Sequence, residues 1–557
     1  MRTALILCWL LAISISGFPQ QAAPPAASSL TKEQVHSLSL LGELWGFLKY
    51  YHPAVAKGTQ DWDSVLIQKI PLYLHAQKQD DIDRLTASWL RETGMPPVCR
   101  QCDNAIPDSL TFNLDLTWIN EQNFSREITG QLLYIRDNRN QGGNRYVSLQ
   151  SYRSLETAEK AYNSPAFLYP SAEYRLLLLF RYWNIVHYFS PYKYICGRDW
   201  KEVLREQIPV FYTVADTLAY QLAYVKLVNM LNDGHSIFWT TPVLQGFWGK
   251  GHFPPFHCKY IGGQMVVSTI YNDSLAALIH IRLGDVITEI NHEKVTDKIK
   301  RLKDYIPASN EAGRLSHFTG YFLFADPDSS FIIKKIRNGR EITDSFVMPR
   351  YITAYPDTVP WRMLEGNIGY VNMAFLKVPE VDKMMRAMEN TRGIIFDLRN
   401  YPENTDVLLA RYLSPRPFVM GRISAPDMNY PGVFRFQKQY QYGRANHHAY
   451  AGKVVILADE VSVSHSEFSV MVLQAAAPHA MTIGSTTAGQ DGDVSTRIWL
   501  PGGYFTRFSS LGIYYPDGTI AQRKGVRIDK TVIPTIKGLQ EGRDEVLEAG
   551  VAYIKTE

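Results

Sequence analysis

Hydrophobic and polar positions alternate differently in the two halves of the chain. From about residue 366 onward, short apolar runs such as 368–371 and 393–396 are bounded by polar turns, which is typical of strands buried on both faces of a sheet. A helical pattern over 378–388 lies between these two runs. The second half therefore predicts strand–helix–strand units with right-handed crossovers, forming a layered α/β sheet with helices outside.

The first half contains an internal duplication. Residues 40–71 align without a gap with residues 178–209, so that Trp45 matches Trp183. Each copy shows a helix ended by a Ser-Pro or His-Pro step, a loop, and a second helix that opens at Asp-Trp. We expect two α-helical hairpins with buried aromatic residues. The segment between the copies, where apolar residues alternate with polar ones, is expected to be β-rich.

A strand–turn–helix unit late in the chain carries the main chemical signal. Its turn holds Ser462, Ser464 and Ser466 around His465, at the start of a helical pattern. A serine there projects its hydroxyl from a sharp turn, and the first N–H groups of the helix lie where an oxyanion would develop. Ser464 with Glu467 also fits a capping box, which needs no chemistry.

The sequence of this turn, SVSHSE, resembles the S-x-S-x-S-E signature of the S41 peptidases, the family of the C-terminal processing proteases and the tricorn core. The resemblance implies a ClpP/crotonase-like α/β core, Ser464 as nucleophile, and the N–H of His465 as one oxyanion donor. Residues 397–399, Asp-Leu-Arg, resemble the family's D-L-R-x-N-x-G-G loop, which supplies the second backbone donor. Both glycines are absent here, and the donor is Tyr401 or Asn400.

Two departures from the family decide the expected base. Gln490 stands where the processing proteases carry a lysine, and because Gln accepts no proton from serine, a Ser–Lys dyad is excluded. The segment 231–235 resembles the L-x-D-G-H-like segment of tricorn-like enzymes, which implies His235 as general base. Gln522 occupies the position of the tricorn acid and is a candidate to orient His235. Four carboxylates are further candidates for this role: Asp233, Asp491, Asp493 and Asp529.

A segment between the histidine and the serine resembles a PDZ domain of the bacterial protease type. Tyr260, Ile261, Gly262 and Gly263 stand where the carboxylate-binding loop would be, and an L-G-D-V-I stretch follows. PDZ domains bind extended C-terminal peptides by strand addition. The resemblance implies that these four residues bind the C-terminal segment of a polypeptide substrate.

The patterns together predict a multidomain protein. Its expected segments are a signal peptide (1–17), a flexible lead-in (18–29), a first helical repeat (30–98), a β-rich connecting region (99–170), a second helical repeat carrying His235 (171–250), a PDZ domain (251–350) and an S41-type catalytic core (351–557).

The N-terminus predicts export to the periplasm or cell envelope of a bacterium. An arginine, an apolar run too short to span a bilayer and small residues form a secretory signal pattern, for which a short membrane anchor is the alternative. No later apolar run is long enough for a membrane span. Cys99 and Cys102 form a CxxC that, in an exported chain, favours a disulfide over a zinc or redox site.

A net charge of +4 over 557 residues gives no indication of nucleic-acid binding, and no residue pattern indicates a cofactor or metal site. Three functions fit the sequence. The first is an exported serine endopeptidase that uses Ser464 and His235 and binds peptide C-termini through the PDZ domain. The second is a catalytically inactive S41-like peptide-binding or adaptor protein, and the third is a hydrolase of non-peptide esters or acyl groups.

Overall fold

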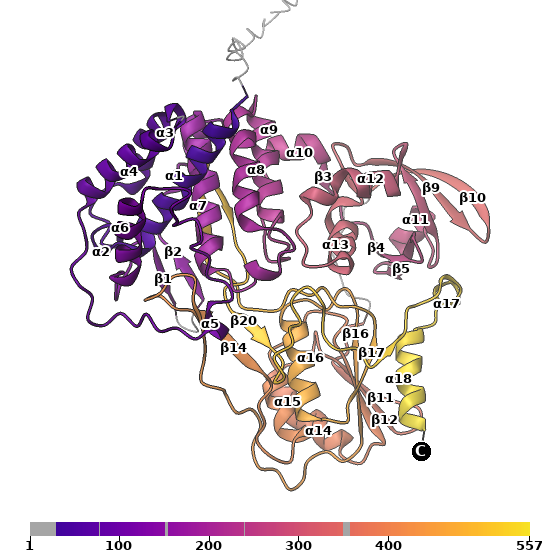
Figure 1. Cartoon of the computed structure of the whole chain (residues 1–557). Coiled ribbons are helices and arrows are strands. Elements are labelled where there is room, and N and C mark those ends of the chain that lie inside the picture. The colour runs from indigo at the N-terminus through magenta and orange to yellow at the C-terminus, as the bar shows by residue number, and fades with distance from the viewer. Residues whose placement is uncertain (1–28, 77, 151–153, 239, 349–356, 557) are drawn as a thin grey trace, which may run out of the picture.

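The computed structural model describes residues 29–76, 78–150, 154–238, 240–348 and 357–556. The expected signal peptide (1–17) and all of the lead-in except Ser29 lie outside the described residues. Figure 1 shows three lobes: a helical lobe, a sheet lobe inserted beside it, and an α/β lobe below both. No helix within the described ranges is long and apolar enough to cross a bilayer.

Two helical hairpins form the centre of the helical lobe. In the first, the indole N–H of Trp45 donates to the carbonyl of Trp62 (3.0 Å) and that of Trp62 donates back to Trp45 (3.1 Å). In the second, Trp183 and Trp200 exchange the same two bonds at 2.6 and 3.1 Å. The duplicated sequence thus forms duplicated structure, with each indole N–H satisfied inside an apolar core. The helices are α1 (Lys32–Tyr51), α3 (Trp62–His75), α7 (Ala172–Phe189) and α8 (Trp200–Thr213).

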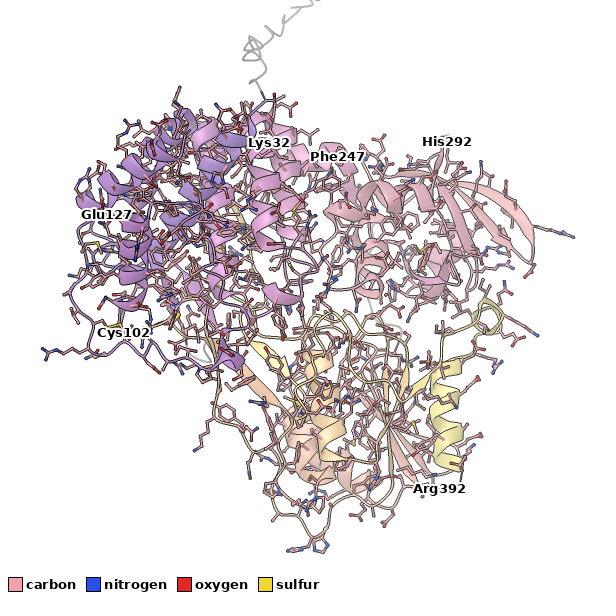
Figure 2. The ribbon with its side chains drawn as sticks, viewed as in Figure 1. Lys32, Cys102, Glu127, Phe247, His292 and Arg392 are labelled. Carbon is pink, nitrogen blue, oxygen red and sulfur yellow. A yellow bond between two sulfur atoms is a disulfide. The ribbon has the colours of Figure 1, made fainter. Side chains whose placement is uncertain are left out.

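The connecting region 99–170 is not β-rich, contrary to expectation. It contains α5 (Asp108–Thr111) and α6 (Arg126–Asp137), with only two three-residue strands, β1 (Val147–Leu149) and β2 (Leu155–Thr157). The apparent alternation is part of a helical face, since α6 buries Ile128, Leu132 and Ile135 at spacings of four and three. Cys99 and Cys102 form a disulfide at the edge of this lobe, where Figure 2 labels Cys102.

The inserted lobe is an antiparallel sheet in the order β10-β9-β6-β5-β4, with β7 paired to β6. Within the described ranges, β4 pairs on one side only, so it is an edge strand. The lobe comprises β4 (Phe256–Ile261), β5 (Gln264–Ile270), α11 (Asp273–Leu278), β6 (Val286–Ile290), β7 (Glu293–Lys294), α12 (Val295–Leu302), α13 (Glu311–His317), the π-helix η5 (Phe318–Phe322), β9 (Ser330–Arg337) and β10 (Arg340–Val347).

The α/β lobe is built on a six-stranded sheet in the order β11-β12-β13-β16-β17-β21, parallel except for β11. Apolar residues of α14, α15 and α16 cover one face, and α18 covers the other. The strands are β11 (Trp361–Leu364), β12 (Ile368–Asn372), β13 (Gly393–Asp397), β16 (Lys453–Ala458), β17 (Met481–Gly484) and β21 (Lys530–Thr531). The helices are α14 (Val381–Met388), α15 (Asp406–Leu413), α16 (His465–Ala476) and α18 (Glu545–Lys555).

A hairpin from the second half of the chain packs into the helical lobe. It consists of β18 (Ile498–Leu500) and β19 (Tyr504–Thr506), and its apolar residues belong to the core of the helical lobe. The hydroxyl of Tyr504 accepts a hydrogen bond from Gln221 (3.0 Å) in α9 (Thr217–Asn229). The two halves that the sequence separates at residue 350 therefore share one hydrophobic core.

Shorter elements complete the fold: α2 (Pro53–Ala56), α4 (Gln79–Thr93), α10 (Pro242–Trp248), β3 (Lys250–Gly251), β8 (Ala325–Asp326), β14 (Arg422–Pro426), β15 (Phe434–Phe436), β20 (Gly512–Tyr514) and α17 (Ile536–Gln540).

Candidate active site

Ser464 occupies a strained turn between β16 and α16. Its backbone has φ +53° and ψ −111°, a conformation that a residue with a side chain rarely adopts. A serine in such a strand–turn–helix junction presents its hydroxyl at the edge of the sheet. Its own N–H donates to Glu467 Oε2 (3.3 Å), so Ser464 and Glu467 form a capping box at the start of α16 while the serine hydroxyl stays partly exposed.

His235, which follows α9, contacts this hydroxyl although it lies 229 residues earlier in the chain. Nε2 of His235 is 3.1 Å from Oγ of Ser464. Burial lowers the pKa of His235, while the carboxylate of Asp233 opposes the shift. The imidazole is therefore neutral at neutral pH, and Nε2 is placed to accept the serine proton.

The other ring nitrogen of His235 faces a serine and a carboxylate. Nδ1 lies 2.9 Å from Oγ of Ser509, which in turn lies 3.1 Å from Oδ1 of Asp233. Asp233 is held in place because it also accepts the N–H groups of Ser509 (2.6 Å) and His235 (3.0 Å). The chain His235–Ser509–Asp233 suits the tautomer with its proton on Nδ1, which leaves the lone pair of Nε2 toward Ser464.

Gln522, a candidate to orient His235, contacts a different residue. Its Nε2 lies 3.3 Å from Oγ of Ser309, and that hydroxyl accepts the N–H of Gly234 at 2.9 Å. Gln522 thus supports the loop before the histidine rather than the imidazole. Among the four candidate carboxylates, Asp233 is the one joined to His235 through a hydrogen bond; Asp493 adds only to the field at the ring.

Asp491 and Asp529 lie elsewhere. Burial raises the pKa of Asp491, and the nearby Glu467 adds to this shift. Asp529 accepts a hydrogen bond from the N–H of Thr482 (2.8 Å). Ser509 was missed by sequence reasoning, because a serine within the stretch Phe-Ser-Ser-Leu carries no motif. Only the return of the chain after the β18–β19 hairpin brings it to His235.

Gln490, at the position of the processing-protease lysine, packs beneath the histidine loop. A Cβ at Gly234 would collide with its side-chain oxygen, so glycine is required for the loop to approach Gln490 so closely. The Asp-Gly-His sequence thus has a separate reason for each residue: Asp233 binds Ser509, Gly234 permits the close contact, and His235 reaches Ser464.

Ser462 and Ser466, on either side of Ser464, hold the Asp-Leu-Arg loop against the turn that carries Ser464. The hydroxyl of Ser462 donates to the carbonyl of Leu398 (2.6 Å), and the hydroxyl of Ser466 donates to that of Asn400. The backbone N–H groups of His465, Asn400 and Tyr401 make no hydrogen bond within the residues that the structure describes. Backbone donors therefore remain available on both sides of Ser464.

Residues 367–532, which contain the loop, Ser464 and Ser509, match the sequence profile of peptidase family S41. This segment is a peptidase family S41 domain. The chain that carries it is a serine-type peptidase. No curated protein matches it in sequence.

Solved structures similar to this S41 peptidase include mature CPAF complexed with lactacystin, at 14% identity and a TM-score of 0.51, covering 69% of this chain and 99% of CPAF. The photosystem II D1 C-terminal processing protease is 17% identical with a TM-score of 0.39, over 66% of this chain and 97% of its own. The tricorn protease is 14% identical with a TM-score of 0.34, over 76% of this chain and 42% of its own. At these identities the likeness to CPAF concerns the fold alone.

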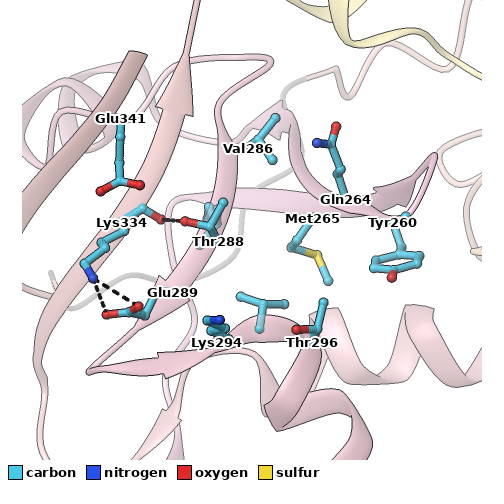
Figure 3. Close-up of a pocket in the computed structure, with 13 residues that line it drawn as sticks. Tyr260, Gln264, Met265, Val286, Thr288, Glu289, Lys294, Thr296, Lys334 and Glu341 are labelled. Carbon is cyan, nitrogen blue, oxygen red and sulfur yellow. Dashed lines mark hydrogen bonds and ion pairs between the residues drawn. The ribbon is translucent and has the colours of Figure 1, made fainter. Parts of the chain in front are cut away.

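The loop expected to bind a peptide carboxylate forms the turn of a β-hairpin in the inserted lobe. Gly262 and Gly263, with φ +56° and +83°, form the two-residue turn of the β4–β5 hairpin, and Ile261 pairs with Gln264. A Gly-Gly pair fits such a turn because both positions need positive φ. Tyr260 and Gly263 line a cavity of about 420 Å³, shown in Figure 3, on the sheet of the inserted lobe rather than at its free edge.

Glu467 connects the nucleophile turn to the loop after β17. Its carboxylate accepts hydrogen bonds from the hydroxyl of Thr487 (2.6 Å) and from the N–H groups of Gly489 (2.8 Å), Gln490 (2.9 Å) and Ser464. Burial nevertheless raises its pKa to about 7, because the four donors only partly offset the loss of hydration.

We expect the substitution Glu467→Gln to flatten the pH dependence of stability between pH 5 and 7.5. A carboxyl whose pKa is raised from 4.5 to about 7 on folding stabilises the fold below pH 4.5, and this stabilisation is lost as the pH rises through 7. The loss is on the order of 3 kcal/mol. The measurement is the difference in thermal midpoint between the two pH values, with the same substitution at exposed Glu311 as control. An unchanged difference in the Glu467 variant would contradict this account.

Proposed function

We propose that this S41 peptidase is an exported endopeptidase in which Ser464 is the nucleophile and His235 the general base. The observation that carries the proposal is the 3.1 Å contact between Oγ of Ser464 and Nε2 of His235, made by a neutral imidazole at a strained turn. The N–H groups of His465 and Tyr401 are the proposed oxyanion donors.

In the proposed reaction, Nε2 of His235 accepts the hydroxyl proton as Oγ of Ser464 attacks the peptide carbonyl. The backbone donors stabilise the negative charge on the carbonyl oxygen of the tetrahedral intermediate. The imidazolium then gives its proton to the leaving amine, and an acyl-enzyme forms. Water, deprotonated by the same imidazole, hydrolyses the ester. The negative charge of Asp233 stabilises the imidazolium, since the carboxylate lies 3.7 Å from Nδ1. Ser509 joins the two groups by hydrogen bonds.

Substitutions at Asp233 and Ser509 test separately the charge of Asp233 and the hydrogen bond of Ser509 at His235. We expect Asp233→Asn to lower kcat by about 10- to 100-fold and to shift the acidic limb of the pH profile further down, because Asp233 raises the pKa of His235. Ser509→Ala keeps the carboxylate, so it should lower kcat with little shift of the limb. The measurement is kcat against pH for the two variants and wild type. Identical limbs in all three would show that Asp233 does not act on the imidazole.

Delivery of polypeptide C-termini by a PDZ-like inserted lobe remains part of the proposal, with Tyr260, Ile261, Gly262 and Gly263 at the peptide carboxylate and the edge of β4 along the peptide backbone. The free edge of β4 can pair with an extended peptide by strand addition. Lys259 of β4 forms ion pairs with Asp459 and Glu460 (3.0 Å), directly before the nucleophile turn. A peptide lying along β4 would therefore extend toward Ser464.

Export is proposed from the signal pattern of residues 1–17 and from the disulfide between Cys99 and Cys102, which forms in oxidising compartments.

The experiment is labelling of the signal-free chain with a fluorophosphonate probe, followed by mass-spectrometric mapping of the adduct. We expect the adduct on Ser464, no adduct in Ser464→Ala, and strongly reduced labelling in His235→Ala. Ser469→Ala is the matched control, because Ser469 lies in the same helix and its hydroxyl has no partner among the described residues.

Folded wild type that takes no label would favour the inactive peptide-binding alternative. Labelling accompanied by turnover of ester but not peptide substrates would favour the non-peptide hydrolase.

A further inference from the structure

A cavity of about 310 Å³ lies between the inserted lobe and the nucleophile turn, separate from the cavity in Figure 3. Val461 and Val463, which precede Ser464, form one wall. Residues of α13 and η5, among them His317 and Gly320, form the opposite wall. The cavity thus begins one residue from the nucleophile.

The lining of this cavity is aromatic and aliphatic. Phe253, Phe256, Tyr271 and Tyr321 contribute rings. Phe253 is 50% exposed and Tyr321 62% exposed, although both are large and hydrophobic. Exposed aromatic residues around a concave site are typical of a surface that binds another apolar group.

Two polar side chains of the cavity, Glu460 and His317, are already paired. Glu460, at the edge of the cavity, forms an ion pair with Lys259 through one carboxylate oxygen (3.0 Å). The other oxygen of Glu460 accepts a hydrogen bond from the hydroxyl of Ser485 (3.2 Å). Nδ1 of His317 contacts the carbonyl of Pro307 (2.6 Å), and burial lowers the pKa of its ring. An occupant with a charged side chain would find no unpaired opposite charge, so the lining favours an apolar one.

From this geometry we infer a substrate subsite: the cavity receives a bulky apolar side chain, aromatic or long aliphatic, of the polypeptide at one position beside the scissile bond. The inference rests on the proposed function, because it takes Ser464 as the attacking residue. The S41 peptidase then selects polypeptide segments by an apolar residue close to the cleaved bond.

Gly320 allows the cavity to be filled without disturbing the fold. A Cβ built on this residue meets no heavy atom within 4 Å. Because Gly320 lines the cavity, Gly320→Phe adds a ring at its wall. Gly130→Phe is the matched control, since Gly130 also lies in a helix, has an equally open Cβ position and is far from the cavity in the sequence.

The experiment is cleavage of a peptide library by wild type and both variants, with cut sites identified by mass spectrometry. We expect wild type to enrich bulky apolar residues at one position flanking the cut. Replacing that residue by alanine should lower kcat/KM by roughly 10- to 100-fold. Gly320→Phe should lose the preference or shift it to small residues, while Gly130→Phe retains it. Fluorophosphonate labelling should be unchanged in the control variant Gly130→Phe.

Two results would overturn the inference while leaving the proposed function intact: labelled, active enzyme with no apolar preference at any flanking position, or a preference that Gly320→Phe does not change. Loss of labelling in wild type would instead remove the proposed function itself.

Discussion

Replacing Ser464 by alanine is expected to lower kcat for peptide hydrolysis by a factor on the order of 10⁴ to 10⁶. The variant lacks the atom that forms the acyl-enzyme, and the backbone donors alone sustain only a small part of the rate. Stability should change by less than about 1 kcal/mol, because alanine keeps the backbone of the strained turn and removes a single partly buried hydroxyl. Steady-state kinetics and thermal unfolding measure the two effects.

The control for this experiment is Ser469→Ala in the same helix, which should retain full activity. A Ser464→Ala variant that is folded but retains more than a tenth of wild-type activity would show that the serine is not the nucleophile. Activity and thermal unfolding are measured on the same preparation. A loss of activity in a variant that is also unfolded would be explained by the unfolding.

His235→Ala is expected to lower kcat by about 10³- to 10⁵-fold, since the serine then loses the imidazole that lies 3.1 Å from its hydroxyl. The double variant with Ser464→Ala should be no slower than either single variant, because the two residues act as one unit. In wild type, activity should fall at acidic pH as His235 takes a proton. Because burial lowers its pKa, this limb lies below pH 6.5.

Kinetics of both single variants and the double variant, and a pH profile of wild type, check this prediction. His447→Ala, a change at an exposed histidine, is the control. Multiplicative losses in the double variant, or an acidic limb above pH 6.5, would contradict the role given to His235.

The parts of the fold that local patterns specify could be predicted. The buried strands β12 and β13 and the helix between them, α14, follow from apolar runs and helical spacing, and the duplicated Trp residues lie in duplicated hairpins. The β-rich expectation for 99–170 was wrong because apolar residues two positions apart in α6 are also consistent with a helix.

The candidate site also has a part that motifs could predict and a part that depends on tertiary structure. Sequence motifs brought attention to Ser464 and His235, which the structure places in contact. The partner of His235 could not be predicted in full, because Ser509 reaches it only through packing of the β18–β19 hairpin. Gln522 was chosen by position in a motif, and its actual contact with Ser309 depends on tertiary structure. The Gly-Gly pair was ambiguous, because positive φ serves a hairpin turn as well as an anion-binding loop.

The order in which the chain is made has a consequence for the cell. Ser464 follows His235 by 229 residues and Ser509 follows it by 274, while the hairpin that positions Ser509 docks among helices formed much earlier. A growing chain therefore presents His235 first, then Ser464, and Ser509 last, so the three residues can come together only near the end of synthesis. On the proposed mechanism, proteolytic activity begins only after almost the whole polypeptide has been synthesised and has folded, so growing chains cannot cleave the proteins around them.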